Sequence, residues 1–346
     1  MSASWSLLVH MTASARLAPY AKAALAELCS APANPRLDIA VQLDGRGTKK
    51  PTRYRIALRK AVPVPPASWT YRPRTSLKDF VDWGLAPSPR SRSALVLWGE
   101  GGGWIYPAGL YEAASHGPLD AELHQAISGT KRGRVDVLGF DACLMSMVEV
   151  LYGAREICGF QVASETFVPL SGWPYRPMVE LLDKSPPTSP LTWATKIVSC
   201  IEVRPRHSTT LATFASSHAD TLAASFGTLT RELRKLPVSR HAELVRARAE
   251  MVHVGNPFFV DMMSMLRGVE RCVKDHAIVV AVGKVRRVLD RACLAKDAVG
   301  ADNRGMSGTS IFFPQVKTPY LEAYQALAFA QKTGWGAFLT KYHART

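Results

Sequence analysis

The sequence of 346 residues lacks the run of about 18 consecutive apolar residues that a transmembrane helix requires. Its first residues also lack a basic leader and an Ala-x-Ala cleavage site, so they predict a strand and not a signal peptide. We therefore expect a cytoplasmic protein with no membrane partner. Apolar residues make up 47% of the chain, enough for a full core in one large domain or two ordinary ones.

Cysteine is scarce and widely spaced. The six cysteines are Cys29, Cys143, Cys158, Cys200, Cys272 and Cys293, and none belongs to a CxxC pair. This spacing argues against a dense disulfide framework and against a zinc site, so we expect reduced thiols and no bound metal.

Acidic residues are outnumbered, 28 against 43 lysines and arginines, which gives a net charge of +15. Such a chain attracts nucleic acids or acidic proteins through its field alone. However, no aromatic residues alternate with the arginines, and no RRM, KH or helix-turn-helix signature occurs. A solvated basic surface is favoured, and nucleic acid is not expected as a partner. A basic, nucleic-acid-associated interaction protein remains an alternative, which a steep salt dependence of binding would reveal.

Strand and helix patterns alternate in the first half of the chain. Strands are predicted at 5–11, 36–43, 53–58, up to 98, up to 140 and at 160–163. Helices are predicted at 15–28, 77–85, 118–128 and 145–155, and the proline-rich segment 61–75 is expected to be a loop. This alternation predicts an α/β fold with a mostly parallel central sheet and helices on both faces.

The second half is richer in helical periodicity. Helices are predicted at 191–203, 219–236, 242–251, 260–274, 276–291 and 320–333, with strands at 209–214 and 308–314. We therefore divide the chain into a core of residues 1–190 and a helical extension with a late strand at 191–346. Because the breaks between them are short, both parts are expected to form one continuous domain.

Two predicted strands end in residues suited to catalysis. Residues 95–104 read Leu-Val-Leu-Trp-Gly-Glu-Gly-Gly-Gly-Trp, and residues 136–145 read Asp-Val-Leu-Gly-Phe-Asp-Ala-Cys-Leu-Met. The carboxyl ends of parallel strands meet at one edge of a sheet, so these two ends should lie together. Cys143 is the candidate nucleophile, and the other cysteines fit small buried side chains better.

These strand ends resemble the active-site strands of the clostripain-like cysteine peptidases, relatives of the caspases, legumains and gingipains. Further motifs follow in family order across nearly the whole chain: Trp-x-x-Leu-Val-x-Met at 5–11, Leu-x-x-Phe-x-x-Trp at 77–83, Ser-Glu at 164–165, Gly-Trp-Pro-Tyr at 172–175 and Ser-Gly-x-Ser-Ile-Phe-Phe-Pro at 307–314. The resemblance implies a caspase-like sandwich and a cysteine endopeptidase that cleaves after Arg or Lys.

The resemblance also implies how the nucleophile works. Cys143 would attack the scissile carbonyl, and the amides of Gly101 and Cys143 would bind the oxyanion, since glycine lets the backbone approach closely. Because Cys143 stands between a strand and a helix, we expect helix N-terminal amides to lower its pKa.

Substrate binding is implied at several positions. Asp141 would lie in the pocket for a basic P1 side chain, or would alternatively cap the following helix. Relatives often carry an acid at position 171, so Ser171 predicts weaker binding of a cation. The expected substrate-binding residues are Asp141, Ser164, Glu165, Ser171 and Trp173.

Glu100 stands where the family has a histidine. In a Cys–His pair, the imidazolium stabilises the thiolate and later protonates the leaving amine. A carboxylate at this position would disfavour the thiolate and raise the pKa of Cys143. At about 4 Å and an effective dielectric near 20, a unit charge changes the free energy of the thiolate by about 4 kcal/mol, which is roughly 3 units of pKa. Loss of a positioned acid–base group costs about 10²–10⁴ in rate.

Three explanations of Glu100 remain open. The chain can be a natural pseudopeptidase that binds peptides or partners without cutting them, or Glu100 can be an engineered inactivating change. In the third, another histidine takes over or Glu100 itself assists an unusual chemistry. His116 and His124 are the candidate histidines, although each fits a surface histidine better. Whether the chain is an active enzyme is therefore left open.

Partners and cofactors follow from the same resemblance. The expected partners are a peptide or protein substrate with a basic P1 residue and an upstream activator or inhibitor protein, in a bacterial proteolytic cascade. No cofactor is expected, although some relatives use calcium and Glu100 with Asp141 can offer two ligands. Residues 131–134 (Lys-Arg-Gly-Arg) are a candidate self-cleavage site between the catalytic strands.

Overall fold

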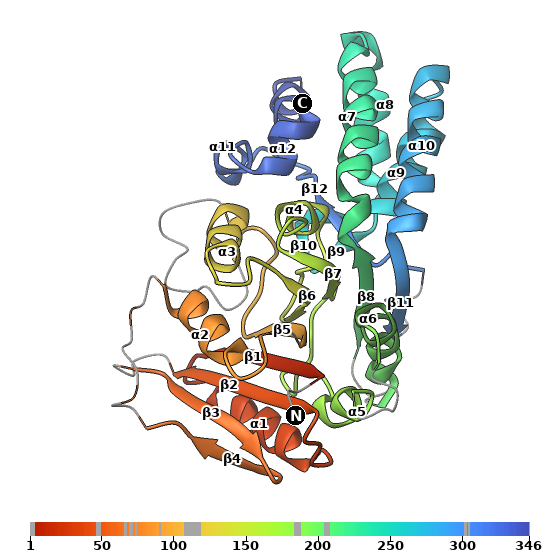
Figure 1. The fold of residues 1–346 in the computed structure, drawn as a ribbon. Coiled ribbons are helices and arrows are strands. Elements are labelled where there is room, and N and C mark those ends of the chain that lie inside the picture. The colour runs from red at the N-terminus through yellow and green to blue at the C-terminus, as the bar shows by residue number, and fades with distance from the viewer. Residues whose placement is uncertain are drawn as a thin grey trace.

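The computed structural model describes residues 4–45, 50–65, 68, 72, 75–89, 91–106, 119–182, 188–203, 208–300, 303 and 305–345. At its centre lies a nine-stranded sheet in the order β11-β8-β7-β6-β5-β1-β2-β3-β4 (Figure 1). Its strands are β1 (Trp5–Ala13), β2 (Leu37–Gly45), β3 (Thr52–Ala57), β4 (Lys60–Pro63), β5 (Arg92–Trp98), β6 (Val135–Asp141), β7 (Cys158–Ala163), β8 (Thr209–Ala215) and β11 (Cys293–Val299).

The five central strands are parallel. β1 pairs with β2 and β5, β5 pairs with β6, and β6 pairs with β7, all in the parallel sense. The register sets Trp98, the last residue of β5, opposite Asp141, the last residue of β6. The segments that follow these two strands therefore leave the same edge of the sheet side by side.

Helices cover both faces of the sheet, and each face has its own apolar core. On one face, α2 (Ser76–Leu85), α3 (Leu119–Ser128) and α4 (Val148–Gly153) pack with side chains such as Leu8 and Leu95. On the other, α1 (Ala18–Ser30), α5 (Tyr175–Glu180) and α6 (Pro190–Lys196) pack with Leu7 and Val96. Successive strand residues point to opposite faces, and the predicted α/β sandwich with a mostly parallel sheet is confirmed.

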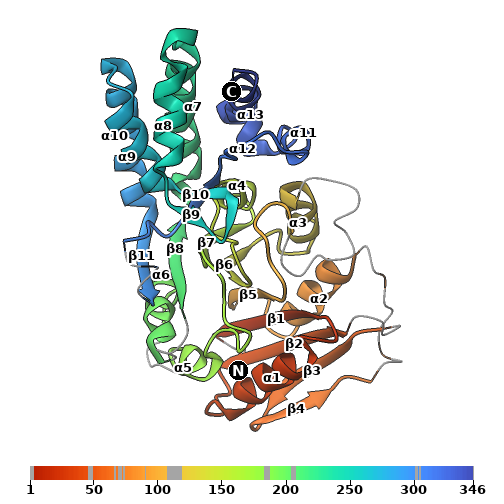
Figure 2. The same ribbon diagram turned by 180° about the vertical axis from the view of Figure 1, so that it is seen from behind.

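The second half adds strands to the sheet and a group of helices beyond it. Figures 1 and 2 show α7 and α10 side by side, continuing from β8 and β11 past the end of the sheet. A small antiparallel sheet, β12-β10-β9, lies near α4. Its strands and the remaining elements are β9 (His253–Val254), β10 (Asn256–Asp261), β12 (Ser310–Phe312), η3 (Ile197–Val203), η4 (Ser216–His218), α7 (Ala219–Lys235), η5 (Val238–Arg240), α8 (His241–Ala249), α9 (Met262–Cys272), α10 (His276–Ala292), α11 (Tyr320–Tyr324), α12 (Ala328–Thr333) and α13 (Trp335–His343).

The two halves of the chain are joined by main-chain bonds as well as by the shared sheet. The Ser310 amide donates to the Ser146 carbonyl over 2.9 Å, and the Ser146 hydroxyl donates to the Gly308 carbonyl over 2.5 Å. Residues after 190 thus complete the architecture begun by the core, while the boundary at 190 itself stays a prediction. Within the described ranges, no helix is long and apolar enough to cross a membrane.

Several predicted elements are wrong in detail. The helix expected from residue 260 begins at Met262, because Asp261 ends β10 and its side chain caps the helix by accepting from the Ser264 amide at 2.6 Å. The helix expected over 320–333 is divided into α11 and α12. β4 (Lys60–Pro63) overlaps the start of the expected loop at 61–75, and β9, β10 and β11 are strands that the pattern did not predict. Both β4 and β11 are edge strands, and edge strands carry little apolar periodicity.

Candidate active site

The loops after β5 and β6 are in direct backbone contact. The Gly99 amide donates to the Asp141 carbonyl over 3.3 Å. A β-carbon at Gly101 would lie 2.5 Å from the Cys143 carbonyl oxygen and 3.0 Å from its amide nitrogen. Only glycine fits such a backbone approach. The structure therefore brings Glu100, Gly101 and Cys143 together, as predicted.

The Cys143 thiol is partly buried beside Val168. The Val168 amide donates to Sγ over 3.2 Å, and the Val168 carbonyl lies 3.7 Å from Sγ. Burial raises the pKa of this thiol, and the carboxylates of Glu100 and Asp141 raise the pKa further, while the Val168 amide and Arg16 act in the opposite direction. These surroundings therefore favour the thiol form of Cys143 over the thiolate.

The expectation that helix amides lower the Cys143 pKa is wrong. The helix α4 begins only at Val148, so the nucleophile stands in a turn and not at a helix N-terminus. Leu144, directly after Cys143, has a φ of 62°, a conformation rare for residues other than glycine. Its amide bonds to the Thr166 carbonyl over 2.9 Å. The turn holds Cys143 at the edge of the sheet with local strain, as is common at functional sites.

The two amides expected to bind the oxyanion donate no hydrogen bond within the described part of the chain. Neither the Gly101 amide nor the Cys143 amide donates to a described residue, whereas the neighbouring amides of Gly102 and Leu144 bond to the Tyr106 and Thr166 carbonyls. Two amides available beside one thiol are the arrangement that stabilises a developing oxyanion.

Glu100 follows β5 and pairs with Arg16, which lies in the turn between β1 and α1. Their closest atoms, Arg16 Nη2 and Glu100 Oε1, are 3.4 Å apart, and the side chains are 70% and 38% exposed. Because both side chains are exposed and both charges act on the Cys143 thiol, the pair lies at the rim of the site. The Glu100 carboxylate thus acts on the Cys143 thiol from this rim, and its place at the histidine position of the family stays a prediction.

Asp141 is held from inside the protein. Its carboxylate is 2% exposed and accepts from the Trp173 amide (3.0 Å to each oxygen) and from the Tyr175 hydroxyl (2.9 Å). Gly172 lies against it, since a β-carbon there would be 2.7 Å from Oδ2. The alternative role of Asp141 as a helix cap is wrong, because α4 begins at a Met147 cap without a side-chain bond. Asp141 instead joins the end of β6 to the 172–175 motif.

The other predicted substrate-binding residues differ in accessibility. Ser164 and Glu165 are fully buried: Ser164 Oγ lies 3.1 Å from Thr210 Oγ1, and Glu165 accepts from the Gly308 amide over 2.7 Å. Burial, reinforced by Asp261, raises the pKa of Glu165 well above its usual range. The Trp173 side chain is also buried, and Ser171 is partly exposed. Their role in substrate binding stays a prediction.

A small apolar pocket lies beside Cys143, and no sequence motif predicted it. Val168, which contacts Sγ, also lines this pocket. No motif marked Val168, and Arg16 was missed too, although its place after β1 follows from the strand order. The lining residues are Val168, Pro169, Gly172, Trp173, Pro174, Ile201, Thr209 and Thr210.

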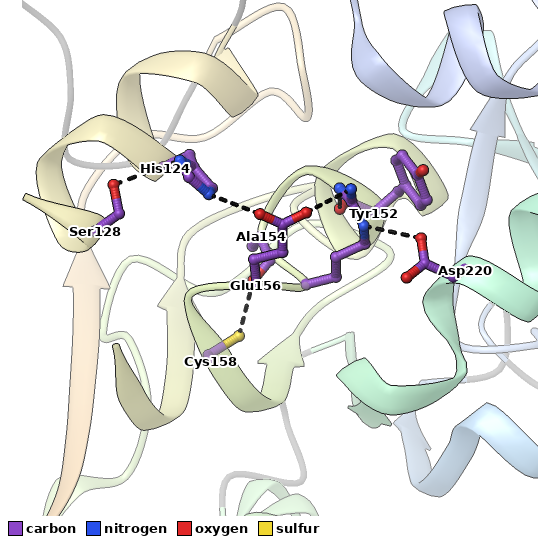
Figure 3. Close-up of polar contacts among 8 residues, drawn as sticks. His124, Ser128, Tyr152, Ala154, Glu156, Cys158 and Asp220 are labelled. Atoms are coloured by element: carbon purple, nitrogen blue, oxygen red, sulfur yellow. Dashed lines mark hydrogen bonds and ion pairs between the residues drawn. The ribbon is translucent and has the colours of Figure 1, made fainter. Parts of the chain in front are cut away.

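His124 lies away from Cys143. Figure 3 shows it on α3, with Nε2 3.2 Å from the Glu156 carboxylate and Nδ1 3.5 Å from the Ser128 hydroxyl. Glu156 precedes β7, so this contact is at the amino edge of the sheet, opposite the edge that carries Cys143. The expectation of a surface histidine is confirmed for His124. His116 lies outside the described residues.

The basic segment 131–134 is anchored to the core. Its Arg132 guanidinium donates to the Ser91 carbonyl over 2.5 Å and pairs with Asp136 at 2.9 Å, and the Lys131 amide donates to Asp82. Its role as a self-cleavage site stays a prediction. As for calcium, the described residues contain no cluster of three or more His, Cys, Asp or Glu side chains that could hold a metal ion.

Comparison with known proteins agrees with this fold. The structure of an inactive zymogen C11 protease from Parabacteroides distasonis matches with a TM-score of 0.72 at 20% identity, covering 96% of this chain and 99% of that one. A secreted C11 cysteine protease from Bacteroides thetaiotaomicron, in complex with an irreversible peptide inhibitor, matches with a TM-score of 0.73 at 17% identity and the same coverage. No curated protein matches. The model of the clostripain family matches residues 9–342, and the chain therefore belongs to the clostripain family of C11 cysteine peptidases.

Proposed function

We propose that this chain is a peptide-binding member of its family, a pseudopeptidase that recognises a basic residue and cleaves slowly or not at all while Glu100 is in place. One observation carries the proposal: the Cys143 thiol is partly buried and bonded to Val168, and burial together with the charges of Glu100 and Asp141 raises its pKa. A cysteine peptidase needs the opposite, a cationic acid–base partner that favours the thiolate.

Three features support retained binding. The amides of Gly101 and Cys143 are available to a carbonyl oxygen, and a small pocket with room for about one water molecule lies beside Val168, which contacts the thiol. The same two carboxylates that disfavour the thiolate also attract a cation, which supports a preference for Arg or Lys at P1.

The test is a comparison of peptides with Arg, Lys, Asp or Asn at P1. Cleavage and binding are measured for the unaltered chain, for Glu100→His and for Cys143→Ala. We expect Glu100→His to raise kcat/KM for the basic peptides by about 10²–10⁴, the usual effect of a positioned acid–base group. The unaltered chain and Cys143→Ala should bind the same peptides with similar affinity.

Two results would count against the proposal. If the unaltered chain already cleaves as fast as Glu100→His, and Cys143→Ala does not cleave, the site has an acid–base group other than residue 100. If none of the three proteins binds any of the peptides, the site does not recognise them. Equal activity on Asp and Arg peptides would overturn only the role given to Asp141 and would leave the rest of the proposal standing.

A cytoplasmic location remains part of this proposal, supported by six cysteines that are all free. The binding partner would be a protein substrate, activator or inhibitor that carries a basic segment. The alternative of a nucleic-acid-associated protein rests on net charge alone and gains nothing from the geometry of the site.

A further inference from the structure

We propose that Arg16 is a positioning residue of this site, which sets the reactivity of Cys143 by pairing with Glu100. The inference rests on Cys143 being the reactive thiol of the proposed function. It assigns a role to the turn between β1 and α1, a segment that contains neither the nucleophile nor its family partner.

The strand order places this turn beside the nucleophile. β1 lies next to β5, and β5 lies next to β6, all parallel, so the segments after the three strands leave one edge of the sheet. A β-carbon at Gly99 would be 2.8 Å from the Thr12 carbonyl oxygen, which shows how closely the first two segments approach. Arg16, Glu100 and Cys143 thus follow three adjacent strands in a row.

The backbone that carries Arg16 is fixed. The Leu17 and Ala18 amides donate to the Ser14 carbonyl over 2.9 and 3.0 Å, and the Leu17 side chain is 3% exposed in the core of the α1 face. The Arg16 side chain extends toward solvent, where it reaches the Glu100 carboxylate at 3.4 Å. The guanidinium can therefore draw Glu100 toward the rim and away from the sulfur.

The charges around the thiol give Arg16 this role. In the described part of the chain, Glu100 and Asp141 are the anionic groups that act on Cys143, and Arg16 is the cationic one. Asp141 is fixed by Trp173 and Tyr175, whereas Glu100 has Arg16 as its ion-pair partner. Loss of Arg16 removes a positive charge from the site and releases Glu100 to approach the thiol, and both effects disfavour the thiolate.

Alkylation of the thiol tests this without any peptide. The rate of iodoacetamide reaction at Cys143 is followed from pH 6 to 10 by mass spectrometry of the Cys143 peptide, which separates it from the other five cysteines. Arg16→Ala should slow alkylation about 3- to 10-fold at neutral pH and move the profile to higher pH, whereas Glu100→Gln should move it to lower pH. In the Glu100→Gln background, Arg16→Ala should have a clearly smaller effect.

Arg231→Ala is the matched control, because it removes the same charge from an exposed position on α7. It should leave the Cys143 profile unchanged, while the buried Cys158, whose pKa burial raises to about 12, should stay unreactive in every variant. An unchanged profile for Arg16→Ala would overturn the inference, as would an effect of the same size with and without Glu100. Since binding and cleavage are not measured, these outcomes stand apart from those of the peptide experiment.

Discussion

The contact between Gly101 and Cys143 leaves no room for a side chain. The atoms that a β-carbon at Gly101 would meet are the carbonyl oxygen and amide nitrogen of Cys143 and the β-carbon of Ala142, none of which can turn aside as the end of a flexible side chain would. Position 101 therefore controls the distance between the two amides that are predicted to bind an oxyanion.

Gly101→Ala should separate these amides and weaken oxyanion binding. In the Glu100→His background, where turnover can be measured, we expect Gly101→Ala to lower kcat by about 10²-fold or more, the usual effect of losing one oxyanion donor. Steady-state kinetics on an Arg peptide provide the measurement.

Gly283→Ala on α10 is a suitable comparison. A β-carbon there meets only the tip of Arg287, at 3.5 Å, so it should leave kcat unchanged and stabilise the helix by about 1 kcal/mol. An active Gly101→Ala protein would show that the Gly101 amide takes no part in the reaction.

At the scale of elements, Glu149 connects α4 to the second half of the chain. Its Oε1 accepts from the Phe312 amide at the end of β12 over 2.9 Å and from the Tyr324 hydroxyl on α11 over 2.8 Å. Burial raises the pKa of Glu149 from 4.5 to about 7. The folded state therefore holds the proton more tightly than the unfolded state does, and this stabilisation is lost as the pH rises from about 4.5 to about 7.

Glu149→Gln should keep the acceptor and abolish the titration. We expect the variant to be more stable than the unaltered chain at pH 8, by on the order of 3 kcal/mol, and equally or less stable at pH 4.5. Denaturant unfolding across this range gives the measurement. Glu322→Gln, which removes an exposed carboxylate from α11, should change neither value. A variant that is less stable at every pH would mean that Glu149 is ionised in the fold.

At the scale of the whole molecule, the core and the extension share one sheet. β8 and β11 extend the sheet beyond β7, and Ser146 binds the backbone of residues 308–310. We expect one cooperative thermal transition with equal calorimetric and van't Hoff enthalpies. Residues 1–190 alone should not fold cooperatively, because β7 would lose its neighbour β8 and become an uncovered edge strand. Two separate transitions in the full chain would contradict a single continuous domain.

The buried strands of the fold can be predicted from the local pattern of apolar residues, whereas the edge strands and several contacts of the site cannot. The strands that lead to Trp98 and Asp141 are buried on both faces, so their apolar runs mark them in the sequence. In the edge strand β11, apolar and polar residues do not alternate regularly, so the sequence pattern did not predict a strand there. Gly101 and Cys143 could be paired through family motifs, whereas Arg16 and Val168 reach the site from segments distant in sequence and carry no motif. The bonds of Asp141 to Trp173 and Tyr175 likewise depend on the packing of β6 against α5.

The exposed position of Glu100 has a consequence for how the protein can change over time. Its side chain is 38% exposed, and its ion-pair contact is with the exposed Arg16. The backbone around Cys143 is instead fixed by Gly101, Leu144 and Val168. A replacement at residue 100 therefore alters the chemistry of the thiol with little cost to folding. Under the proposed function, a single substitution at residue 100 would remove or restore turnover, so selection for a stable fold and selection for turnover would act on separate residues.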